Sequence, residues 1–369
     1  VYKRQVYDYN PEDVVTKGRL MPGQMLAVDT ENSKLLLSDE IDEMLQNRHP
    51  YEKWLQQGLQ HLVPDPTHNF VPEETMSRET LHRYEKLFQL SYEEREQILR
   101  VLAEDGQEAT GSMGDDTPLP VLSHQVRSIY DSFRQSFAQV TNPPIDPYRE
   151  KIVMSLETCF GREHNLFKET EEHANRLVAN TPILSDHKFH MLLKHPDQKH
   201  YAHQRIRLSY DPSKTNLQQA IIDIADQAEH AVHEKTVILV LSDHLIPKHE
   251  LPVHAALATG AVHHRLCQTG QRCDVNIVVE TGTARDPHHM AVLIGYGATA
   301  IYPYLAYACL LDMADNGEIE EKDHGRIGSN YRRGINKGLY KIISKMGIST
   351  IASYRGSQLF EIVGLHRNV

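Results

Sequence analysis

The second half of the chain alternates segments that predict helices with short runs that predict buried strands. Residues 217–233 place apolar side chains on one face at helical spacing, and residues 236–241 form a β-branched run suited to a buried strand. Residues 251–268 are again helical, and residues 275–279 again favour a strand. This alternation is typical of repeated β-α units on a mainly parallel sheet, so the sequence predicts an α/β fold.

The same pattern continues to the end of the chain. We predict a helix at 288–296, a strand at 300–302, a charged and glycine-rich excursion at 316–330, and a helix at 331–346. A last strand at 348–351 and a last helix at 358–363 complete the series of predicted elements.

Residues that could contact a ligand follow three of these predicted strands. They are Ser242, Asp243 and His244 after the first, Glu280, Thr281 and Gly282 after the second, and residues 353–356 after the last. Ligands of such folds usually bind at the carboxyl ends of strands. Glu280 and Arg285 are expected to form an ion pair that clamps their loop. A catalytic triad at 242–244 is disfavoured, because no nucleophile elbow accompanies it.

The first half begins with a hairpin and a helix and then becomes irregular. Residues 25–29 and 35–37 predict two paired strands, residues 39–47 a capped helix, and residues 57–74 a linker. A helix at 92–105 leads into a loop at 111–123, where Gly111 and Gly114 bracket Met113. A second loop at 137–150 carries Thr141 and Asn142 directly before Pro143 and Pro144, which favours extended backbone.

Composition narrows the class of protein. A chain of 369 residues can form one large domain or two medium ones, and because it begins with Val we expect a fragment of a longer polypeptide. With 39 basic and 50 acidic residues its net charge is −11, which argues against nucleic acid or an anionic membrane as partner. No apolar run approaches membrane-spanning length, and four cysteines are too few for a disulfide framework, so we expect a cytoplasmic protein.

Histidines and cysteines offer a competing hypothesis. A metal-dependent lyase or hydrolase on a β-α barrel could use His244, His263, His264, His288 and His289, since imidazole is a common metal ligand. Adjacent histidines on a helix point about 100° apart, so structural roles for them are favoured. Cys267 and Cys273 are expected to be buried free thiols.

Four stretches together carry a family resemblance: residues 111–123, 137–150, 278–304 and 344–364. They resemble the central domain of the large subunit of glutamate synthase, and residues 19–54 resemble the tail of that family's class II glutamine amidotransferase domain. The implied domains are an amidotransferase end at 1–60, a linker at 61–90 and the central domain at 91–369, with the flavin domain absent. The implied fold is an open or incomplete barrel-like array of β-α units, preceded by a small α+β remnant.

The resemblance implies a parent enzyme that transfers the glutamine amide nitrogen reductively to 2-oxoglutarate. Its FMN and its 3Fe-4S cluster would be bound outside this chain: Cys267 and Cys273 have the spacing of the first two cluster cysteines, but Val278 stands where a third is needed. Implied partners are the flanking amidotransferase and FMN domains and an NADPH-oxidising small subunit. NADH or ferredoxin remain alternative electron donors.

The resemblance also implies roles for particular residues. Met113 would lie near the flavin and the 2-oxoglutarate pocket, and Thr141 and Asn142 would contribute to an ammonia tunnel between the two reaction centres. No catalytic residue and no metal ligand is predicted in this chain, and the isolated fragment is expected to be inactive. A third hypothesis is a purely structural scaffold that spaces its neighbouring domains.

Overall fold

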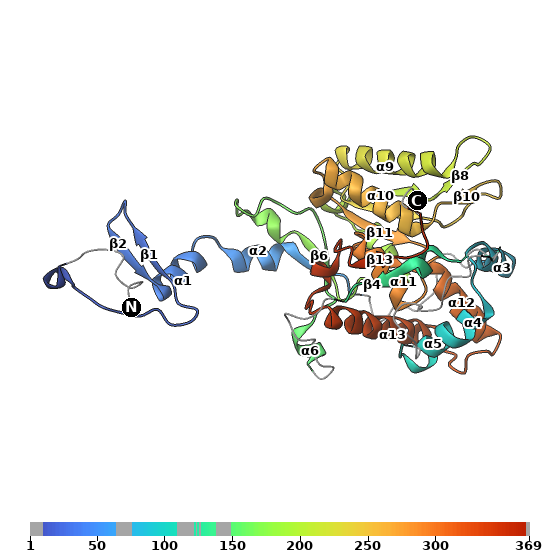
Figure 1. Cartoon of the computed structure of the whole chain (residues 1–369), viewed down its shortest axis with the longest axis horizontal. Coiled ribbons are helices and arrows are strands. Elements are labelled where there is room, and N and C mark those ends of the chain that lie inside the picture. The colour runs from blue at the N-terminus through green and yellow to red at the C-terminus, as the bar shows by residue number, and fades with distance from the viewer. Residues whose placement is uncertain are drawn as a thin grey trace. The chain divides into compact units, whose positions relative to one another are not determined.

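A computed structural model describes residues 10–63, 76–108, 122, 124, 127–137 and 149–366. The chain forms two compact units, which divide between Gln57 and Gly58. In the first unit a 3-10 turn at Pro11–Asp13 precedes strand β1 (Leu26–Asp29), which pairs antiparallel with β2 (Lys34–Leu37) (Figure 1). Helix α1 (Ser38–Gln46) follows directly, and α2 (Tyr51–Gly58) ends the unit. The predicted hairpin and helix are confirmed.

The second unit is built on a four-stranded parallel sheet. Its strands lie in chain order: β7 (His203–Arg207), β9 (Ile238–Ser242), β11 (Asn276–Glu280) and β12 (Ala300–Tyr302). They are joined by helices α9 (Leu217–His233), α10 (Ala255–Gln268) and α11 (Pro287–Gly295), of which α9 and α10 pack side by side (Figure 1). The α/β prediction is confirmed, and the described strands do not close into a barrel.

Strand register determines which side chains meet at each end of this sheet. Arg207, Ser242, Glu280 and Tyr302 lie level with one another at the carboxyl end. Every residue of β9 and β11 is buried, as the apolar β-branched and leucine side chains of these strands require. The sheet therefore presents its only strongly polar side chains near its ends and on the edge strand β7.

Helices pack on one another around the sheet, and one close helix contact depends on a glycine. Residues 92–105 form one helical run, made of α4 (Tyr92–Glu94), a π-helical turn (Arg95–Leu99) and α5 (Arg100–Asp105), as predicted. Helix α13 (His324–Lys345) packs on α5, α11 and α12 (Tyr304–Asp315). A Cβ atom at Gly338 would lie 2.5 Å from Pro287 Cβ, so this glycine permits the close approach of α13 to α11.

Three predicted elements were wrong. Residues 324–330 belong to α13 and not to an excursion, because Asp323 caps the helix by accepting from the Gly325 and Arg326 amides. Residues 358–363 contain strand β13 (Phe360–Ile362), which pairs with β4 (Phe133–Gln135), and not a helix. Residues 348–351 form no strand but only a single bridge between Ser155 and Thr350, and then enter a helix.

The remaining described elements form smaller units around this core. They are helices α3 (Arg78–Leu87), α6 (Glu150–Val153), α7 (Asp186–Leu193), α8 (Gln198–Tyr201) and α14 (Ile351–Tyr354), 3-10 turns at Ile129–Ser132, Glu171–Ala174 and Arg272–Asp274, a three-stranded sheet in the order β3 (Leu59–His61), β6 (Arg176–Ala179), β5 (Thr158–Phe160), and the pair β8 (Ser209–Tyr210) with β10 (Leu251–Pro252). Residues 59–61 are thus part of a sheet, although a linker was predicted there. No helix of the described part of the chain is long and apolar enough to cross a membrane.

Candidate functional site at the carboxyl ends of the parallel strands

Asp243, directly after β9, joins the loops that follow three neighbouring strands. Its carboxylate accepts hydrogen bonds from the Thr281 hydroxyl at 2.5 Å, the Gly282 amide at 2.8 Å and the Tyr304 hydroxyl at 2.9 Å. The residue is completely buried, and this burial raises the pKa of Asp243 to about 7. Because its oxygens face these donors, Asp243 holds the loops together and cannot orient a histidine as a triad would.

Glu280 forms its ion pair with Arg205 of the edge strand β7 and not with Arg285. Its Oε2 lies 3.2 Å from Arg205 Nε, and its Oε1 accepts a hydrogen bond from Arg205 Nη2 at 3.4 Å and lies 4.0 Å from His244 Nδ1. Glu280 is 3% exposed. The predicted Glu280–Arg285 pair is therefore wrong, because strand register places Glu280 on the same face of the sheet as Arg205.

Arg285 instead clamps the loop after β11 to the helical run at 92–105. Its Nη2 lies 2.8 Å from Glu94 Oε1, and its Nη1 donates to the carbonyl oxygens of Phe88 and Gly282. The side chain is only 4% exposed. A structural clamp by Arg285 is thus present, with a different partner from the one predicted.

A cavity of about 440 Å³ opens at this end of the sheet. Glu280, Arg205 and His244 line it from the strand ends, and Tyr302, Tyr304 and Tyr307 supply aromatic walls. Tyr302 donates to Asp186 Oδ1 at 2.7 Å, which fixes both side chains. The predicted strand-end residues Glu280 and His244 therefore do meet in one cavity.

The charge of this cavity is negative. Four carboxylates line it, those of Asp186, Glu280, Asp312 and Asp315, against the two guanidinium groups of Arg78 and Arg205, which leaves two negative charges in excess. The cavity can therefore hold a cationic or hydrogen-bond-donating group. No Ser or Cys is among its lining residues in the described chain.

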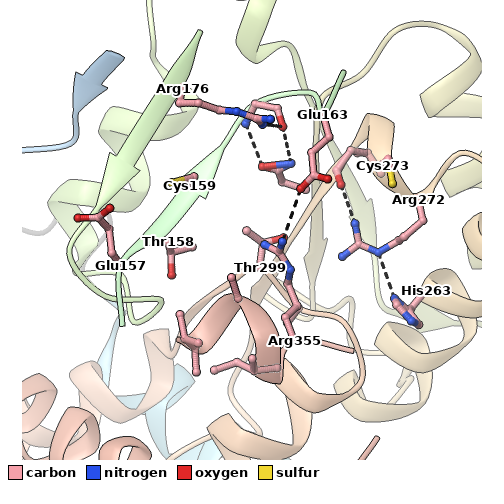
Figure 2. A pocket seen from close by; sticks show the side chains of 17 residues that line it. Glu157, Thr158, Cys159, Glu163, Arg176, His263, Arg272, Cys273, Thr299 and Arg355 are labelled. Carbon is pink, nitrogen blue, oxygen red and sulfur yellow. Dashed lines mark hydrogen bonds and ion pairs between the residues drawn. The ribbon is translucent and has the colours of Figure 1, made fainter. Parts of the chain in front are cut away.

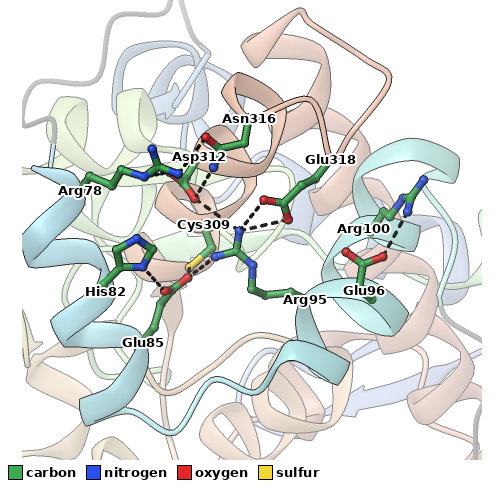
Figure 3. A network of polar contacts seen from close by, with 10 residues as sticks. All are labelled: Arg78, His82, Glu85, Arg95, Glu96, Arg100, Cys309, Asp312, Asn316 and Glu318. Carbon is green, nitrogen blue, oxygen red and sulfur yellow. Dashed lines mark hydrogen bonds and ion pairs between the residues drawn. The ribbon is translucent and has the colours of Figure 1, made fainter.

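An ion network lies beside this cavity and shares Asp312 with it (Figure 3). Arg95 Nη2 lies 3.3 Å from Asp312 Oδ2 and 3.2 Å from Glu318 Oε2, and Arg95 Nη1 pairs with Glu85. The side chains of Arg95, Glu85 and Asp312 are each 12% exposed. One guanidinium thus ties together α3, the π-helical turn, α12 and the segment that follows α12.

The histidines proposed as metal ligands have separate structural contacts. His288 Nε2 lies 3.1 Å from the Tyr130 carbonyl oxygen, and the His289 ring stacks on the Tyr130 ring with centroids 4.4 Å apart. His264 Nδ1 lies 2.8 Å from the Gly260 carbonyl oxygen. Over the described residues no three His, Cys, Asp or Glu side chains are grouped so that they could hold a metal ion.

The prediction of buried thiols at Cys267 and Cys273 was wrong, since both residues are exposed and Cys309 is the buried cysteine. Cys267 lies on the face of α10 that carries His263, whose Nε2 is 3.7 Å from its sulfur. The neighbouring Leu266 faces the core instead. Helical spacing alone did not determine which of these two adjacent side chains points inward.

Met113, Thr141 and Asn142 lie outside the described residues. The described ends of both loops, however, meet the same helix. Lys341 Nζ on α13 lies 3.3 Å from Glu108 Oε2, just before the first loop, and Lys345 Nζ, one turn further, lies 5.4 Å from the ring centroid of Phe137, where the second loop begins. The described residues nearest the start of the two loops, Glu108 and Phe137, therefore contact adjacent turns of α13.

Residues 353–356 do not lie at the carboxyl end of the sheet as predicted. Arg355 instead lines a second cavity with Asn276 and Thr299, at the amino ends of β11 and β12 (Figure 2). Arg176 and Arg272 line the same cavity and were not predicted as site residues. These arginines come from segments far apart in sequence, so no local motif marks them.

The fold and its strand-end contacts define an α/β domain of consecutive β-α units, in which the polar residues at the carboxyl ends of the strands mainly bind one another. The model of the glutamate synthase central domain matches residues 83–366, and the model of class II glutamine amidotransferases matches residues 3–54. The chain belongs to the glutamate synthase central domain family, as the sequence resemblance indicated.

Curated relatives match nearly the whole chain. The glutamate synthase [NADPH] large chain of Bacillus subtilis is 39% identical over 99% of this chain and 23% of its own length. The ferredoxin-dependent glutamate synthase 2 of Synechocystis is 37% identical over 98% of this chain and 24% of its own length. The chain thus spans about a quarter of the length of these relatives. Among solved structures, a flavocytochrome b2 mutant covers 37% of this chain with 11% identity and a TM-score of 0.31.

Proposed function

We propose that this chain is the part of a glutamate synthase that connects the glutaminase site to the FMN site, within an enzyme that transfers the glutamine amide nitrogen reductively to 2-oxoglutarate. The observation that carries the proposal is the order of the two family matches, an amidotransferase end at 3–54 followed by the central domain at 83–366. Relatives named as glutamate synthases contain both parts in one chain.

The first unit supports a flanking amidotransferase domain. Its two-stranded hairpin exposes apolar side chains on both strands, among them Val28 at 65% and Leu35 at 57%, and Ile41 is its only buried hydrophobic residue in the described range. A two-stranded hairpin is marginally stable by itself, and an exposed apolar face of this kind usually packs on another element. We infer that the preceding amidotransferase sequence covers it.

The loops at 111–123 and 137–150 are proposed to supply the connection. Met113 in the first is proposed to contact the flavin and 2-oxoglutarate pocket, where a polarizable thioether can pack on a ring without exchanging protons. Thr141 and Asn142 in the second are proposed to pass ammonia by hydrogen bonds while excluding water. A shared route is supported by the contacts of Glu108 and Phe137, the described residues next to these loops, with Lys341 and Lys345 on one helix.

FMN and the 3Fe-4S cluster are proposed for the flanking flavin domain. A cluster needs three cysteine ligands, and the side chains here do not fit it, since Cys309 is buried beside Glu85 while Cys267 lies beside His263. The electron donor is proposed to be NADPH from a small subunit. All four cysteines are free, which agrees with a reducing cytoplasm.

The test measures how closely glutamine hydrolysis is coupled to glutamate formation in the full-length enzyme. Thr141→Val and Met113→Ala are each expected to raise the ratio of glutamine hydrolysed to glutamate formed, because ammonia would be lost or would reach a disturbed acceptor site. Thr269→Val, an exposed threonine at the end of α10, is the matched control and should leave the ratio unchanged. Unchanged ratios in both loop variants would instead favour a scaffold that only spaces its neighbours.

A further inference from the structure

The second cavity has a volume of about 380 Å³ and lies at the amino end of the parallel sheet. Asn276 begins β11, Thr299 precedes β12, and both line the cavity together with Cys159 of β5 and His263 of α10 (Figure 2). Its volume is within the range of small-molecule sites. All of its lining residues belong to the second unit.

Three arginines from three different elements line this cavity. Arg272 makes hydrogen bonds only to neutral acceptors: the Val275 carbonyl at 2.8 Å, the Gly297 carbonyl at 2.7 Å and His263 Nδ1 at 3.1 Å. Burial, with a smaller contribution from Arg272, lowers the pKa of His263 to about 4, so this histidine is neutral at pH 7. Arg272 therefore forms no ion pair among the described residues, although the more distant carboxylate of Glu163 acts to raise its pKa.

Glu157 and Glu163 also line the cavity, so its three arginines exceed its carboxylates by one charge, and neither Arg176 nor Arg355 has a close ion pair with them. Arg176 Nη1 donates to the Gly161 carbonyl at 2.9 Å, and Arg355 Nη2 lies 3.8 Å from Glu163 Oε1. That distance exceeds a hydrogen bond, and the Glu163 side chain is 53% exposed. Burial, followed by the repulsion of Arg355, lowers the pKa of Arg272 to about 10. A half-buried cation without a close ion-pair partner is costly, which favours an external anion.

We infer that this cavity binds a small organic dianion, a dicarboxylate or a phosphate monoester, through the guanidinium groups of Arg272 and Arg355. Guanidinium groups bind carboxylate and phosphate oxygens in pairs, and Arg272 is already oriented by its two carbonyl contacts. The volume exceeds what a single inorganic ion fills, so the anion carries an organic body. The inference does not depend on the reaction proposed above.

Glu163 acts as a competitor in this site. Its carboxylate points toward the Arg355 guanidinium (Figure 2), where it would take the place of one anionic group of the ligand. Because the side chain is half exposed, it can turn into solvent when the dianion binds. Removing its charge should therefore strengthen binding, a change that no loss of folding could imitate.

The experiment titrates the full-length protein with succinate and, separately, with glycerol 3-phosphate by calorimetry at low salt, and the two arms distinguish the two sources of dianion. At least one should bind, Arg355→Gln should weaken that binding by about tenfold or more, and Glu163→Gln should tighten it. Arg265→Gln removes an arginine of α10 whose partners are Asp226 and Glu229, and it should change nothing.

Two results would overturn the inference. One is that neither anion binds the protein. The other is that binding occurs with the same affinity in Arg355→Gln, Glu163→Gln and the unaltered protein. If Arg355→Gln fails to fold, the outcome for Glu163→Gln decides, since this variant removes only a half-exposed carboxylate.

Discussion

Replacing Arg95 with Met should strongly lower the free energy of unfolding of this domain. The Arg95 guanidinium forms ion pairs with the carboxylates of Glu85, Asp312 and Glu318. The side chains of Glu85 and Asp312 are only 12% exposed. Methionine preserves much of the apolar stem but leaves those two buried charges without their main partner (Figure 3). Breaking a buried ion pair from one side costs about 3–5 kcal/mol.

The lower end of that range is expected here, about 3 kcal/mol, because some compensation remains. Arg78 Nε stays 3.6 Å from Asp312 Oδ1, and Glu318 is 34% exposed and can turn to water. The matched control is Arg100→Met in the same helical run. Arg100 is 38% exposed and pairs with Glu96 and Glu104 at i,i+4 spacing, so its loss should cost less than about 1 kcal/mol.

Urea denaturation followed by far-ultraviolet circular dichroism measures both variants. Tryptophan fluorescence would not serve, because the single tryptophan, Trp54, lies in the first unit. The reasoning is refuted if Arg95→Met lowers the free energy of unfolding no more than Arg100→Met does. Equal effects would mean that the network contributes as little as exposed ion pairs.

Two further predictions concern packing and pH. In α13, Gly338→Ala should lower the free energy of unfolding by about 1–3 kcal/mol, because its Cβ would meet Pro287. Gly328→Ala, which has no atom nearer than 3.4 Å to its Cβ, should raise the free energy of unfolding by up to about 1 kcal/mol. Changes of the same sign for both variants in urea denaturation would contradict this prediction. Since the pKa of Asp243 is raised from 3.8 to about 7, the folded chain holds this proton more tightly, and the free energy of unfolding should fall as pH rises between those values. Asp243→Asn should reduce that slope, and an unaltered slope in denaturation across this range would count against the assignment.

Strands β9, β11 and β12 of the parallel sheet could be predicted from sequence because they are buried on both faces, whereas the partly exposed edge strand β7 was not predicted. The apolar run in β9 and the exact length of α9 follow from periodicity that tertiary contacts reinforce. Residues 358–363 were predicted wrongly because a run this short fits either helix or strand, and pairing with β4 decided the outcome. Gly325 and Gly328 suggested a loop, but both lie inside α13, where Asp323 caps the first turn.

The candidate sites were predictable only in part. Glu280 and His244 could be placed at one sheet end, because parallel strands end on the same side. The choice of Arg205 over Arg285 as partner of Glu280 depends on strand register, which the sequence does not contain. The arginine cavity joins residues separated by almost half the chain, so only the folded structure brings them together.

The central claim is that ammonia passes internally from the glutaminase site to the flavin site along this segment, and isotope transfer tests it most directly. The full-length enzyme is supplied with glutamine labelled with nitrogen-15 in the amide, together with excess unlabelled ammonium. The account predicts that the newly formed glutamate carries the amide label almost undiluted. Label diluted in proportion to the free ammonium would show that ammonia equilibrates with solvent, and would contradict it.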